Sequence, residues 1–499
     1  MALPSTPEAD PQSHPTILEL WNVDVMHIIM SYADRRVVSN LMQTCSALNY
    51  AGTKYLLADG LALRSEYGLV SFLCFLYARG FPGECVRRLT PLNKVTIDFH
   101  KPTENIPPAL EFLFEIFALA AFNLTSLTIG EAEALLASHP SLGTAMAKLT
   151  TLKTIDFLQT GQHCATLLRT LRSSLVTVNI HFDLDSGEPE NEVPAESDMN
   201  PILLLEGSKS TLESLRASFA VSSPDGPCYP NVAHLELSYT VLPYIEDYIR
   251  AFPNLQSLAS FYCAGFQDAL TWHSRREMAM QYQAVHGTWR SLQHYEGSML
   301  VLWVWGLTCN IRSVRLSFEH WQQLGVDPNF LEDIILDVRP SDLALRLPGA
   351  SWLLDDDVRT VLSKEGRLQA LEIYVLFHMN EADDTVSVQH ILDLLVDVVR
   401  TSSMLKFKLI LDSTWMRVFR DRVERDDEKK LPLMPFEVYL QDMDVDAYAD
   451  TLLARAPSLK EVHVSVVEHR DKCTRQADRR RREPSTTGTS RDETDASAS

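Results

Sequence analysis

A short pattern of apolar residues recurs along most of this chain and limits the folds that it can adopt. An apolar residue is followed three positions later by a second and two positions after that by a third. The last two lie two residues apart, so they point to the same side of a β-strand. Successive copies are mostly 20 to 37 residues apart. The clear copies are Leu92/Val95/Ile97, Leu124/Leu127/Ile129, Leu152/Ile155/Phe157, Leu175/Val178/Ile180, Leu212/Leu215/Ala217, Val232/Leu235/Leu237, Ile311/Val314/Leu316, Leu368/Leu371/Ile373, Leu433/Phe436/Val438 and Leu459/Val462/Val464.

Weaker copies fill several of the longer gaps, and the segments between copies share a second feature. The weaker copies are Leu255/Leu258, Leu292/Tyr295, "DLALRL" (342–347) and "MLKFKLIL" (404–411). In "YIRAFPNLQSL" (248–258) and "LLARAPSLKEV" (452–462), a helical segment ends in proline, and Asn or Ser then precedes the first apolar residue. Proline cannot continue a helix, and the Asn or Ser side chain can satisfy free backbone groups at the turn. Each copy therefore predicts a helix, a turn, a strand and a loop.

Such a segment cannot bury both of its apolar faces alone, but it can when stacked on copies of itself, which is the principle of a solenoid. An ordinary α/β domain with alternating helices and strands is the alternative. The pattern resembles degenerate leucine-rich repeats over residues 91–467. This resemblance implies an α/β fold, an irregular solenoid of parallel strands with helices on the outer face. The Asn or Cys that normally follows the last leucine by three positions is matched by Cys263 and is mostly missing elsewhere.

The stretch "WNVDVMHIIMSYADRRVVSNLMQTCSAL" (21–48) predicts two short amphipathic helices. Asn22 and Asp34 are suitable N-caps for them. The first helix has one apolar stripe at i, i+3, i+4 and i+7 spacing, and the second has an apolar face of its own. These two sets are Val25, Ile28, Ile29 and Tyr32, and Val37, Val38, Leu41, Cys45 and Leu48. With a third short helix through "TKYLL" (53–57), these few residues cannot form a stable core alone, so their apolar surface needs the repeats or another chain.

This N-terminal region, residues 16–60, resembles an F-box. The family pattern has Leu-Pro, an acidic residue, two aliphatic residues and then Ile-Phe-Ser-Tyr-Leu. Trp21 and Asn22 stand where Leu-Pro is expected. The matching positions are Asp24, Val25, Met26, Ile29, Met30, Ser31, Tyr32, Val38, Cys45 and Leu48. The family's proline, its large residue at Ala33 and its late tryptophan are absent. An F-box followed by leucine-rich repeats is a familiar arrangement, and the combination is also similar to the divergent F-box-like families of fungi.

The resemblance implies a non-catalytic substrate receptor of an SCF-type (cullin-RING) ubiquitin ligase, found in the cytoplasm, the nucleus or both. The helices would dock onto a Skp-type adaptor, and through it onto a cullin, while the repeats would bind a protein substrate that the sequence does not identify. The adaptor-binding residues would be Trp21, Val25, Ile29, Tyr32, Val38, Leu41, Cys45 and Leu48. Alternatively, the chain is a leucine-rich-repeat scaffold in which these helices only cap the solenoid, packing inward against "SFLCFLYARGF" (71–81).

The remaining segments predict little folded structure. Residues 1–15 are polar and proline-rich, without the features of a signal peptide, and predict a disordered lead. Residues 61–90 predict a helical connector. The acidic stretch 183–201 predicts a disordered loop within one repeat. Residues 468–499 predict a disordered tail whose basic run, "KCTRQADRRRRE" (472–483), could instead act in nuclear import or contact RNA.

The net charge, the lengths of the apolar runs and the cysteine spacing limit the kinds of partner that we expect. The formal net charge is −21, which argues against broad nucleic-acid binding, because neutralising phosphates needs a positive surface. No apolar run reaches the roughly 20 residues of a membrane span. The eight cysteines have no CxxC pairing and no zinc-type spacing with histidine, so they predict reduced thiols packed as small apolar side chains.

The sequence offers no catalytic, cofactor-binding or metal-binding motif, and we therefore predict a protein that is not an enzyme and has no cofactor. His163 and Cys164 could form a thiol–imidazole pair, but neighbours on a helix point apart. The "DDD" run at 355–357 could bind a cation and is better explained as a helix cap. Trp303 and Trp305, near Trp289 and Trp321, could line a groove, although their alternation with Leu302 and Val304 favours a doubly buried strand.

Overall fold

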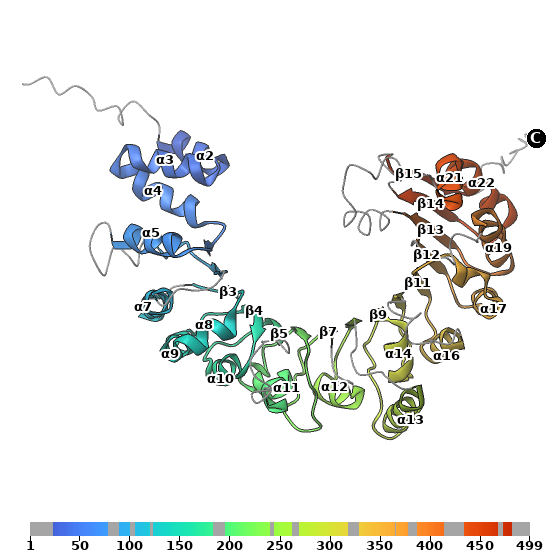
Figure 1. The fold of residues 1–499 in the computed structure, drawn as a ribbon, viewed down its shortest axis with the longest axis horizontal. Helices are drawn as coiled ribbons and strands as arrows, with labels where there is room; N and C mark the ends of the chain where they lie inside the picture. The colour runs from blue at the N-terminus through green and yellow to red at the C-terminus, as the bar shows by residue number, and fades with distance from the viewer. Residues whose placement is uncertain are drawn as a thin grey trace, which may run out of the picture. The chain divides into compact units, whose positions relative to one another are not determined.

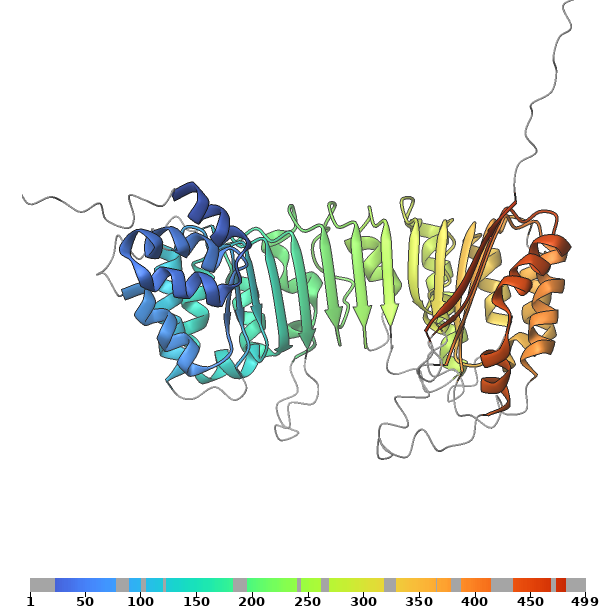
Figure 2. The same cartoon turned by 90° about the horizontal axis from the view of Figure 1, so that it is seen from above.

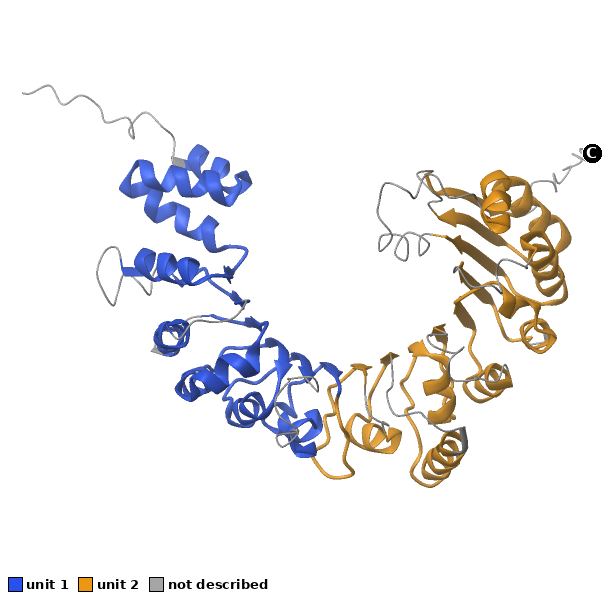
Figure 3. Cartoon of the chain, in the orientation of Figure 1, with its two compact units in different colours: residues 1–219 blue, residues 220–499 orange. Residues whose placement is uncertain are grey.

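The computed structural model divides into two compact units, residues 1–219 and 220–499 (Figure 3). Both units are mixed α/β, with strands on one side and helices on the other (Figures 1 and 2). The structure describes residues 23–77, 89–99, 105–119, 123–182, 195–239, 244–261, 269–317, 329–364, 366–377, 387–413, 434–467 and 473–481. No helix in these ranges is both long and apolar enough to cross a membrane.

Unit 1 begins with helices and continues as alternating strands and helices. Its six strands follow chain order, and neighbouring strands within it are parallel. The strands are β1 (Leu61–Leu63), β2 (Lys94–Ile97), β3 (Ser126–Ile129), β4 (Thr154–Thr160), β5 (Thr177–Phe182) and β6 (Ser214–Ser218). The α-helices are α2 (Val23–Tyr32), α3 (Arg35–Thr44), α4 (Ser46–Leu57), α5 (Glu66–Tyr77), α7 (Ile106–Leu119), α8 (Ala132–Ser138), α9 (Pro140–Ala147), α10 (Gln162–Thr170) and α11 (Pro201–Leu204). Short 3₁₀ helices are η1 (Glu196–Asp198) and η2 (Glu206–Ser208).

Unit 2 repeats this order and ends with one antiparallel strand. Strands β7 to β14 are parallel neighbours in chain order, and β15 pairs antiparallel with β14, so the sheet is open. The strands are β7 (His234–Ser238), β8 (Ser257–Phe261), β9 (His294–Ser298), β10 (Ser313–Ser317), β11 (Asp342–Leu347), β12 (Ala370–Leu376), β13 (Lys406–Asp412), β14 (Glu461–Val467) and β15 (Arg475–Arg480). The helices are α12 (Ile245–Ala251), α13 (Ala269–His286), α14 (Met299–Trp305), α16 (Asn329–Val338), η3 (Ser351–Leu354), α17 (Asp356–Lys364), α19 (Val388–Thr401), α21 (Pro435–Asp442) and α22 (Val445–Arg455).

The recurring apolar pattern places the core between the strands and the helices. In β3, for example, Leu127 and Ile129 are buried, while Ser126 and Thr128 on the other side of the strand are partly exposed. The first apolar residue of this copy, Leu124, is also buried, just before the strand. The weaker copies at 255–258, 292–295, 342–347 and 404–411 contribute strands β8, β9, β11 and β13. The sequence pattern therefore predicts most strands correctly.

A backbone hydrogen-bond ladder joins each turn to the next. The carbonyl of Thr125, just before β3, accepts from the N–H groups of Lys153 and Thr154, both at 2.8 Å, just before β4. The same doubled bond recurs at Asn93, Lys153, Val176, Ala233, Gln256, Arg312, Ser341, Gln369 and Leu405. One carbonyl with two lone pairs thus holds two donors from the following repeat.

Ser, Thr and Asn side chains in these turns add a second set of bonds. Asn254 Nδ2 donates to the carbonyl of Pro230 at 2.9 Å, and Ser458 Oγ donates to that of Ser402 at 3.2 Å. Thr211 Oγ1 donates to the carbonyl of Leu175 at 2.7 Å. The predicted role of Asn and Ser in satisfying turn backbone is confirmed, and the acceptor belongs to the preceding repeat.

Two predicted segments form a different element from the one expected. Residues 299–305 are helix α14 rather than a strand, and every one of them is buried. A short run that is apolar at every position fits a buried helix as well as a buried strand. The copy at 433–438 also predicts a strand, and this prediction is wrong. Pro435 begins helix α21, and the Glu437 carboxylate caps it by accepting from Met434 N at 2.8 Å. Phe436 and Leu440, four residues apart, form the buried face of that helix.

Three segments contain more structure than predicted. The connector 61–90 includes strand β1, which pairs with β2 through Leu61 and Val95. In the acidic stretch 183–201, η1 and the start of α11 are ordered, because Asp198 is buried and bonded to Arg169 at 2.7 Å. Residues 1–15 and 183–194 lie outside the described residues.

The third such segment is β15, which lies within the predicted tail 468–499. Its arginines are used in folding. Arg475 donates to the carbonyls of Leu440 and Met443 at the end of α21, and Arg481 donates to the carbonyls of Leu453, Ala456 and Leu459 around the end of α22. A guanidinium group suits a helix C-terminus, where unpaired carbonyls and the negative end of the dipole lie. Much of the basic run thus closes the last repeat.

The turn ladder can be tested with Thr211→Val, which keeps the side-chain shape and removes the hydroxyl. We expect the free energy of unfolding to fall by about 1 kcal/mol, because the carbonyl of Leu175 loses a donor from the next repeat. The measurement is urea denaturation followed by circular dichroism. The control is Thr401→Val, whose hydroxyl bonds only within α19. Equal losses for the two variants would contradict a special role for the turns.

Candidate functional site

The first candidate site is an apolar stripe on α2. Val25, Ile28, Ile29 and Tyr32 occur at i, i+3, i+4 and i+7, and their exposed fractions are 45%, 59%, 41% and 89%. We call these four residues the α2 stripe. The opposite side of the helix buries Met26 and Met30. Four large apolar side chains in one row on a ten-residue helix are typical of a surface that another protein covers.

The three helices are held together by a small core behind the stripe. Met30 of α2 and Val38 and Met42 of α3 form its buried centre. Gly52 of α4 lets α3 approach, since a Cβ at that position would lie 2.3 Å from Met42 Cγ. His27 Nδ1 and Tyr55 Oη form a further bond between α2 and α4 at 2.9 Å. Asp34 caps α3 as predicted, accepting from Val37 N at 2.9 Å.

The predicted adaptor-binding residues divide into two groups in this structure. Val25, Ile29 and Tyr32 are exposed on the α2 stripe. Val38 is 1% exposed, and Leu41 and Leu48 pack against the same core, so these three stabilise the module from within. Cys45 caps α4, where its Sγ accepts from Leu48 N at 3.5 Å. Trp21 lies outside the described residues, as does the N-cap Asn22.

The periodicity of the second helix could not separate these groups. Val37 and Val38 both belong to its predicted apolar face, yet Val37 is 42% exposed and Val38 is buried. A ten-residue helix packed mainly against one other helix buries only a narrow stripe. Which neighbouring residue lies in that stripe depends on how α3 crosses α4, which the sequence of α3 alone does not specify.

The second candidate site is a hollow of about 800 Å³ on the unit 2 sheet. The residues that line it come from strands β10 to β15. The helices of unit 2 cover the other face of these strands (Figures 1 and 2). Alternate residues of each strand point to this face, because their neighbours are buried toward the helices. The polar or charged side chains lining it include Arg315, Asp342, Glu372, Lys406, Lys408, Glu461, His463, Asp478 and Arg480. We call this region the sheet hollow.

Most charged side chains of the sheet hollow are paired across neighbouring strands. Lys408 Nζ lies 3.0 Å from Glu372 Oε1, and His463 Nδ1 lies 2.7 Å from Asp478 Oδ1. Glu461 receives Lys406 Nζ at 2.9 Å and Arg480 Nε at 3.4 Å. The hydrogen bond from Lys406 is the main cause of a lowered pKa at Glu461. The sequence pattern does not predict this surface, because the residues that meet here come from six strands that are far apart in the chain.

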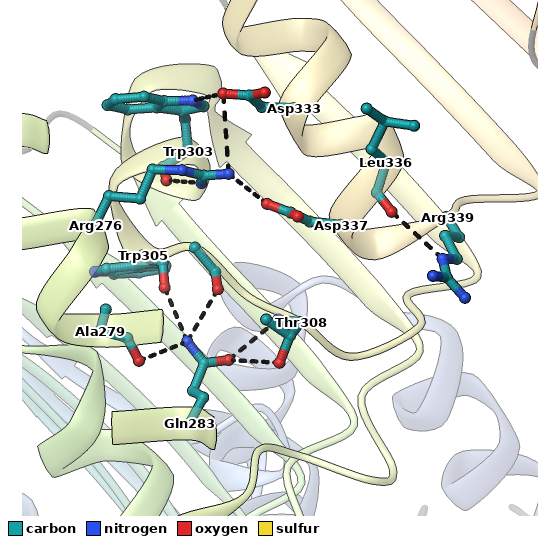
Figure 4. Close-up of polar contacts among 11 residues, drawn as sticks. Arg276, Ala279, Gln283, Trp303, Trp305, Thr308, Asp333, Leu336, Asp337 and Arg339 are labelled. Carbon is teal, nitrogen blue, oxygen red and sulfur yellow. Dashed lines mark hydrogen bonds and ion pairs between the residues drawn. The ribbon is translucent and has the colours of Figure 1, made fainter. Parts of the chain in front are cut away.

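Trp303 and Trp305, two of the tryptophans considered as groove residues, have structural roles (Figure 4). Trp289, Trp303 and Trp305 are at most 2% exposed, and Trp321 lies outside the described residues. The ring of Trp303 stacks on Phe330 with centroids 3.9 Å apart, and its Nε1 donates to Asp333 Oδ2 at 2.8 Å. These contacts leave no open aromatic face on Trp303.

Two polar side chains of α13 lock α14 in place (Figure 4). Arg276 donates to the carbonyl of Trp303 and to Asp337 Oδ2, both at 2.5 Å. Gln283, which is buried, donates to the carbonyls of Trp305 and Gly306 at 3.1 and 3.0 Å. These bonds satisfy the carbonyls at the C-terminal end of α14 and tie α13, α14 and α16 together.

His163 and Cys164 do not form a catalytic pair. Burial raises the pKa of the Cys164 thiol well above its ordinary value, which disfavours the reactive thiolate. The imidazole of His163 instead bonds to Glu133, with Nδ1 and Oε1 2.8 Å apart. The Glu133 carboxylate also accepts from the N–H groups of Gly161, His163 and Cys164 at 2.9, 2.9 and 3.0 Å. It therefore serves as the N-terminal cap of α10, supplied by α8.

The acidic run 355–357 has the predicted capping role. Asp355 Oδ1 accepts from Asp357 N at 2.8 Å and from Val358 N at 3.3 Å, at the start of α17. Within the described ranges, no group of three or more His, Cys, Asp or Glu side chains could hold a metal ion.

Comparison with known proteins adds no relatives: no family model matches the chain, and no curated protein matches it.

The Glu133 cap gives a prediction about pH. Burial raises the pKa of Glu133, but the hydrogen bonds from His163 and Cys164 outweigh it, and the net pKa in the folded chain is lowered. Its stabilisation is therefore present above the unfolded pKa of about 4.3 and is lost as the pH falls through the folded value. We expect Glu133→Gln to cost about 1–2 kcal/mol at pH 7 and less at a pH of about 3.5.

Urea denaturation of both proteins at the two pH values measures this difference. Glu206→Gln, at an exposed position outside any such cap, is the control and should change little at either pH. A cost for Glu133→Gln that is the same at both pH values would show that the carboxylate charge does not matter.

Proposed function

We propose that this protein is a non-catalytic substrate-recognition subunit of an SCF-type ubiquitin ligase. In this proposal, residues 16–60, of which the structure describes helices α2 to α4, act as an F-box-like module that docks a Skp-type adaptor. The strand–helix segments act as a degenerate leucine-rich-repeat solenoid that binds a protein substrate. The observation that carries the proposal is the exposure of the α2 stripe, since Val25, Ile29 and Tyr32 face solvent from a module with its own small core.

The energetics of the stripe fit a docking role. Fully burying an exposed valine, leucine, isoleucine or phenylalanine side chain stabilises by about 1.5–3 kcal/mol. The four side chains of the α2 stripe could thus contribute several kcal/mol to binding, after the cost of association is subtracted. Docking through the stripe would require no rearrangement of the core, because Met26 and Met30 on the other side of α2 stay buried.

The sheet hollow supports the second half of the proposal. Its polar lining comes from side chains that point away from the core, so these side chains do not fill the core. Side chains of this kind can vary without loss of stability, which suits a surface that selects a substrate. The sheet hollow belongs to unit 2, so it supports substrate binding independently of the N-terminal helices.

A second function is favoured by a specific contact. Phe75 of α5 packs against the core of Met30, Val38 and Met42, so the N-terminal helices also cover the apolar side of the next element. A terminal cap needs this kind of contact. The chain would then be a repeat scaffold in which the helices have no partner of their own.

The two functions differ in what the α2 stripe does. We expect the full-length chain to co-elute with a Skp-type adaptor in size-exclusion chromatography, and the double variant Ile28→Asp/Ile29→Asp to elute alone. Its melting temperature should stay near that of the wild type, because both side chains are exposed. Two charges in a buried apolar interface would abolish binding.

The control is Asn40→Asp/Ser46→Asp, which adds the same charge at exposed positions of α3 and α4 and should still co-elute. A wild-type chain that fails to bind the adaptor, together with a marked loss of stability in the α2 variant, would favour the scaffold.

A further inference from the structure

Two outward positions in the sheet hollow carry only a methyl group. Ala344 of β11 and Ala370 of β12 lie among long side chains in the pairing register. Ala344 sits between Arg315 and Glu372, and Ala370 sits between Asp342 and Lys406. The hollow is therefore a depression floored by alanines and walled by charged groups. Its volume of about 800 Å³ is enough for several side chains of a ligand.

The charge of this surface differs from that of the whole chain, whose net charge is −21. On the outward face of β10 to β15, the register brings together five cationic side chains, Arg315, Arg346, Lys406, Lys408 and Arg480, and four anionic ones, Asp342, Glu372, Glu461 and Asp478. Asp412 has the same parity, but it is buried and accepts a hydrogen bond from Tyr374 Oη. The exposed part of β10 to β15 on this face thus carries one more cation than anions. Arg315, at its edge, lies 3.5 Å from Glu296 of the neighbouring strand β9.

One of these cations is bound to an aromatic ring instead of a carboxylate. Arg346 lies over the ring of Tyr374, with its Cζ 5.5 Å from the ring centroid. A guanidinium group in this position keeps its hydrogen-bond donors available, because the ring contacts only its face. Arg346 therefore adds positive charge beside the paired groups.

The cationic groups are also the outermost groups of their pairs. Lys406 and Arg480 are 62% and 82% exposed, while the Glu461 that they share is 37% exposed. Lys408 is 42% exposed, against 30% for its partner Glu372. An approaching molecule would meet the ammonium and guanidinium groups before the carboxylates. His463 and Asp478 are the exception, with the carboxylate more exposed.

These cations can exchange partners at small cost. An exposed ion pair contributes about 0–1 kcal/mol to the free energy of unfolding. Lys406 or Lys408 can therefore turn from its carboxylate to a ligand with little loss of stability. Both lysines lie on β13 two residues apart, which places them about 6.6 Å apart on one face. Alternate carboxylates of an extended polypeptide have this same spacing.

We propose that the sheet hollow binds an acidic, extended segment of a partner protein. Alternate Asp or Glu side chains of the segment would pair with Lys406 and Lys408 along β13, and its smaller side chains would lie over Ala344 and Ala370. This inference deepens the proposed function, on which it rests for the view that the repeats hold a protein substrate, by stating the class of substrate.

Fluorescence anisotropy of a labelled peptide of alternating Glu and Ser, about twelve residues long, tests the inference with the full-length chain. We expect saturable binding that weakens as salt is raised, and no binding of the matched Lys/Ser peptide. Lys406→Glu/Lys408→Glu should weaken binding by at least about tenfold, because like charges then face the ligand. Lys54→Glu/Lys209→Glu, the same charge change at exposed positions of unit 1, should bind as the wild type does.

A second variant separates shape from charge. Ala344→Met/Ala370→Met fills the hollow and leaves every charge in place, and we expect it to weaken binding of the Glu/Ser peptide severalfold. Each variant is first compared with the wild type by thermal melting, so that a fold defect is recognised. Unchanged binding by the Met variant, or equal losses in the unit 1 control, would reduce the interaction to general charge attraction and overturn the site.

Two further outcomes are decisive. Stronger binding by a chain that lacks residues 482–499 would overturn the assignment to a partner, because the acidic residues of that segment would then compete for the hollow. Adaptor capture gives a separate readout for the proposed function. If Ile28→Asp/Ile29→Asp and the wild type both fail to bind an adaptor while the Glu/Ser peptide binds normally, the acidic-segment site stands and the ligase role does not.

Discussion

The doubled hydrogen bond found at most of the described turns is the constraint on which the rest of the structure depends. A single carbonyl, such as that of Thr125 or Leu405, holds two N–H groups that precede the next strand. The bond sets where each strand starts relative to the one before it, so Leu, Ile and Val side chains arrive at the same depth in the core. Because the donors and acceptors are backbone groups, the arrangement tolerates wide variation in side chains. This explains how the segments align although the Asn or Cys that could follow each copy of the pattern is mostly missing.

The alignment of the turns also creates the outward face of the sheet. Once consecutive strands start in register, their outward residues form rows that cross the sheet, as in Arg315, Ala344, Glu372 and Lys408. Residues that are distant in sequence then become neighbours at strand spacing, about 4.8 Å. Charge pairs, the alanine floor and the exposed lysines all follow from this register. In this way a feature needed for folding also produces a surface suited to recognition.

The first and last described segments each cover one end of a row of parallel strands, and they do so with different elements. A row of parallel strands exposes an unpaired edge and the apolar side of its last segment. In unit 2, β15 pairs antiparallel with β14. Arg475 of β15 bonds to the end of α21, and Arg481, just after the strand, bonds to the end of α22. In unit 1, α2 to α4 form a small helical module whose core contacts Phe75. That module covers an apolar face on one side and leaves the α2 stripe free on the other.

Sequence reasoning worked where periodicity was clear and failed where burial was complete or contacts were long-range. The apolar copies predict strands β2 to β14 with few exceptions, and Asp34 and Asp355 cap helices as expected. The apolar run 299–305 carries no periodicity, so its helical state depends on Arg276 and Gln283 of another helix. The basic segment 475–480 looks disordered by composition and becomes a strand because α21 and α22 present carbonyls and carboxylates to it.

By itself, the sequence determined the alternation of strands and helices, the inward side of each strand, and the apolar stripe of α2. These depend on local spacing, since a strand repeats every two residues and a helix about every 3.6. Only the tertiary structure decided that Val38 is buried while Ile29 is exposed, and that Lys406, Ala370 and Arg315 surround one hollow. The physical reason is that exposure and adjacency depend on which segments pack together and in what register, and those contacts join residues far apart in the chain.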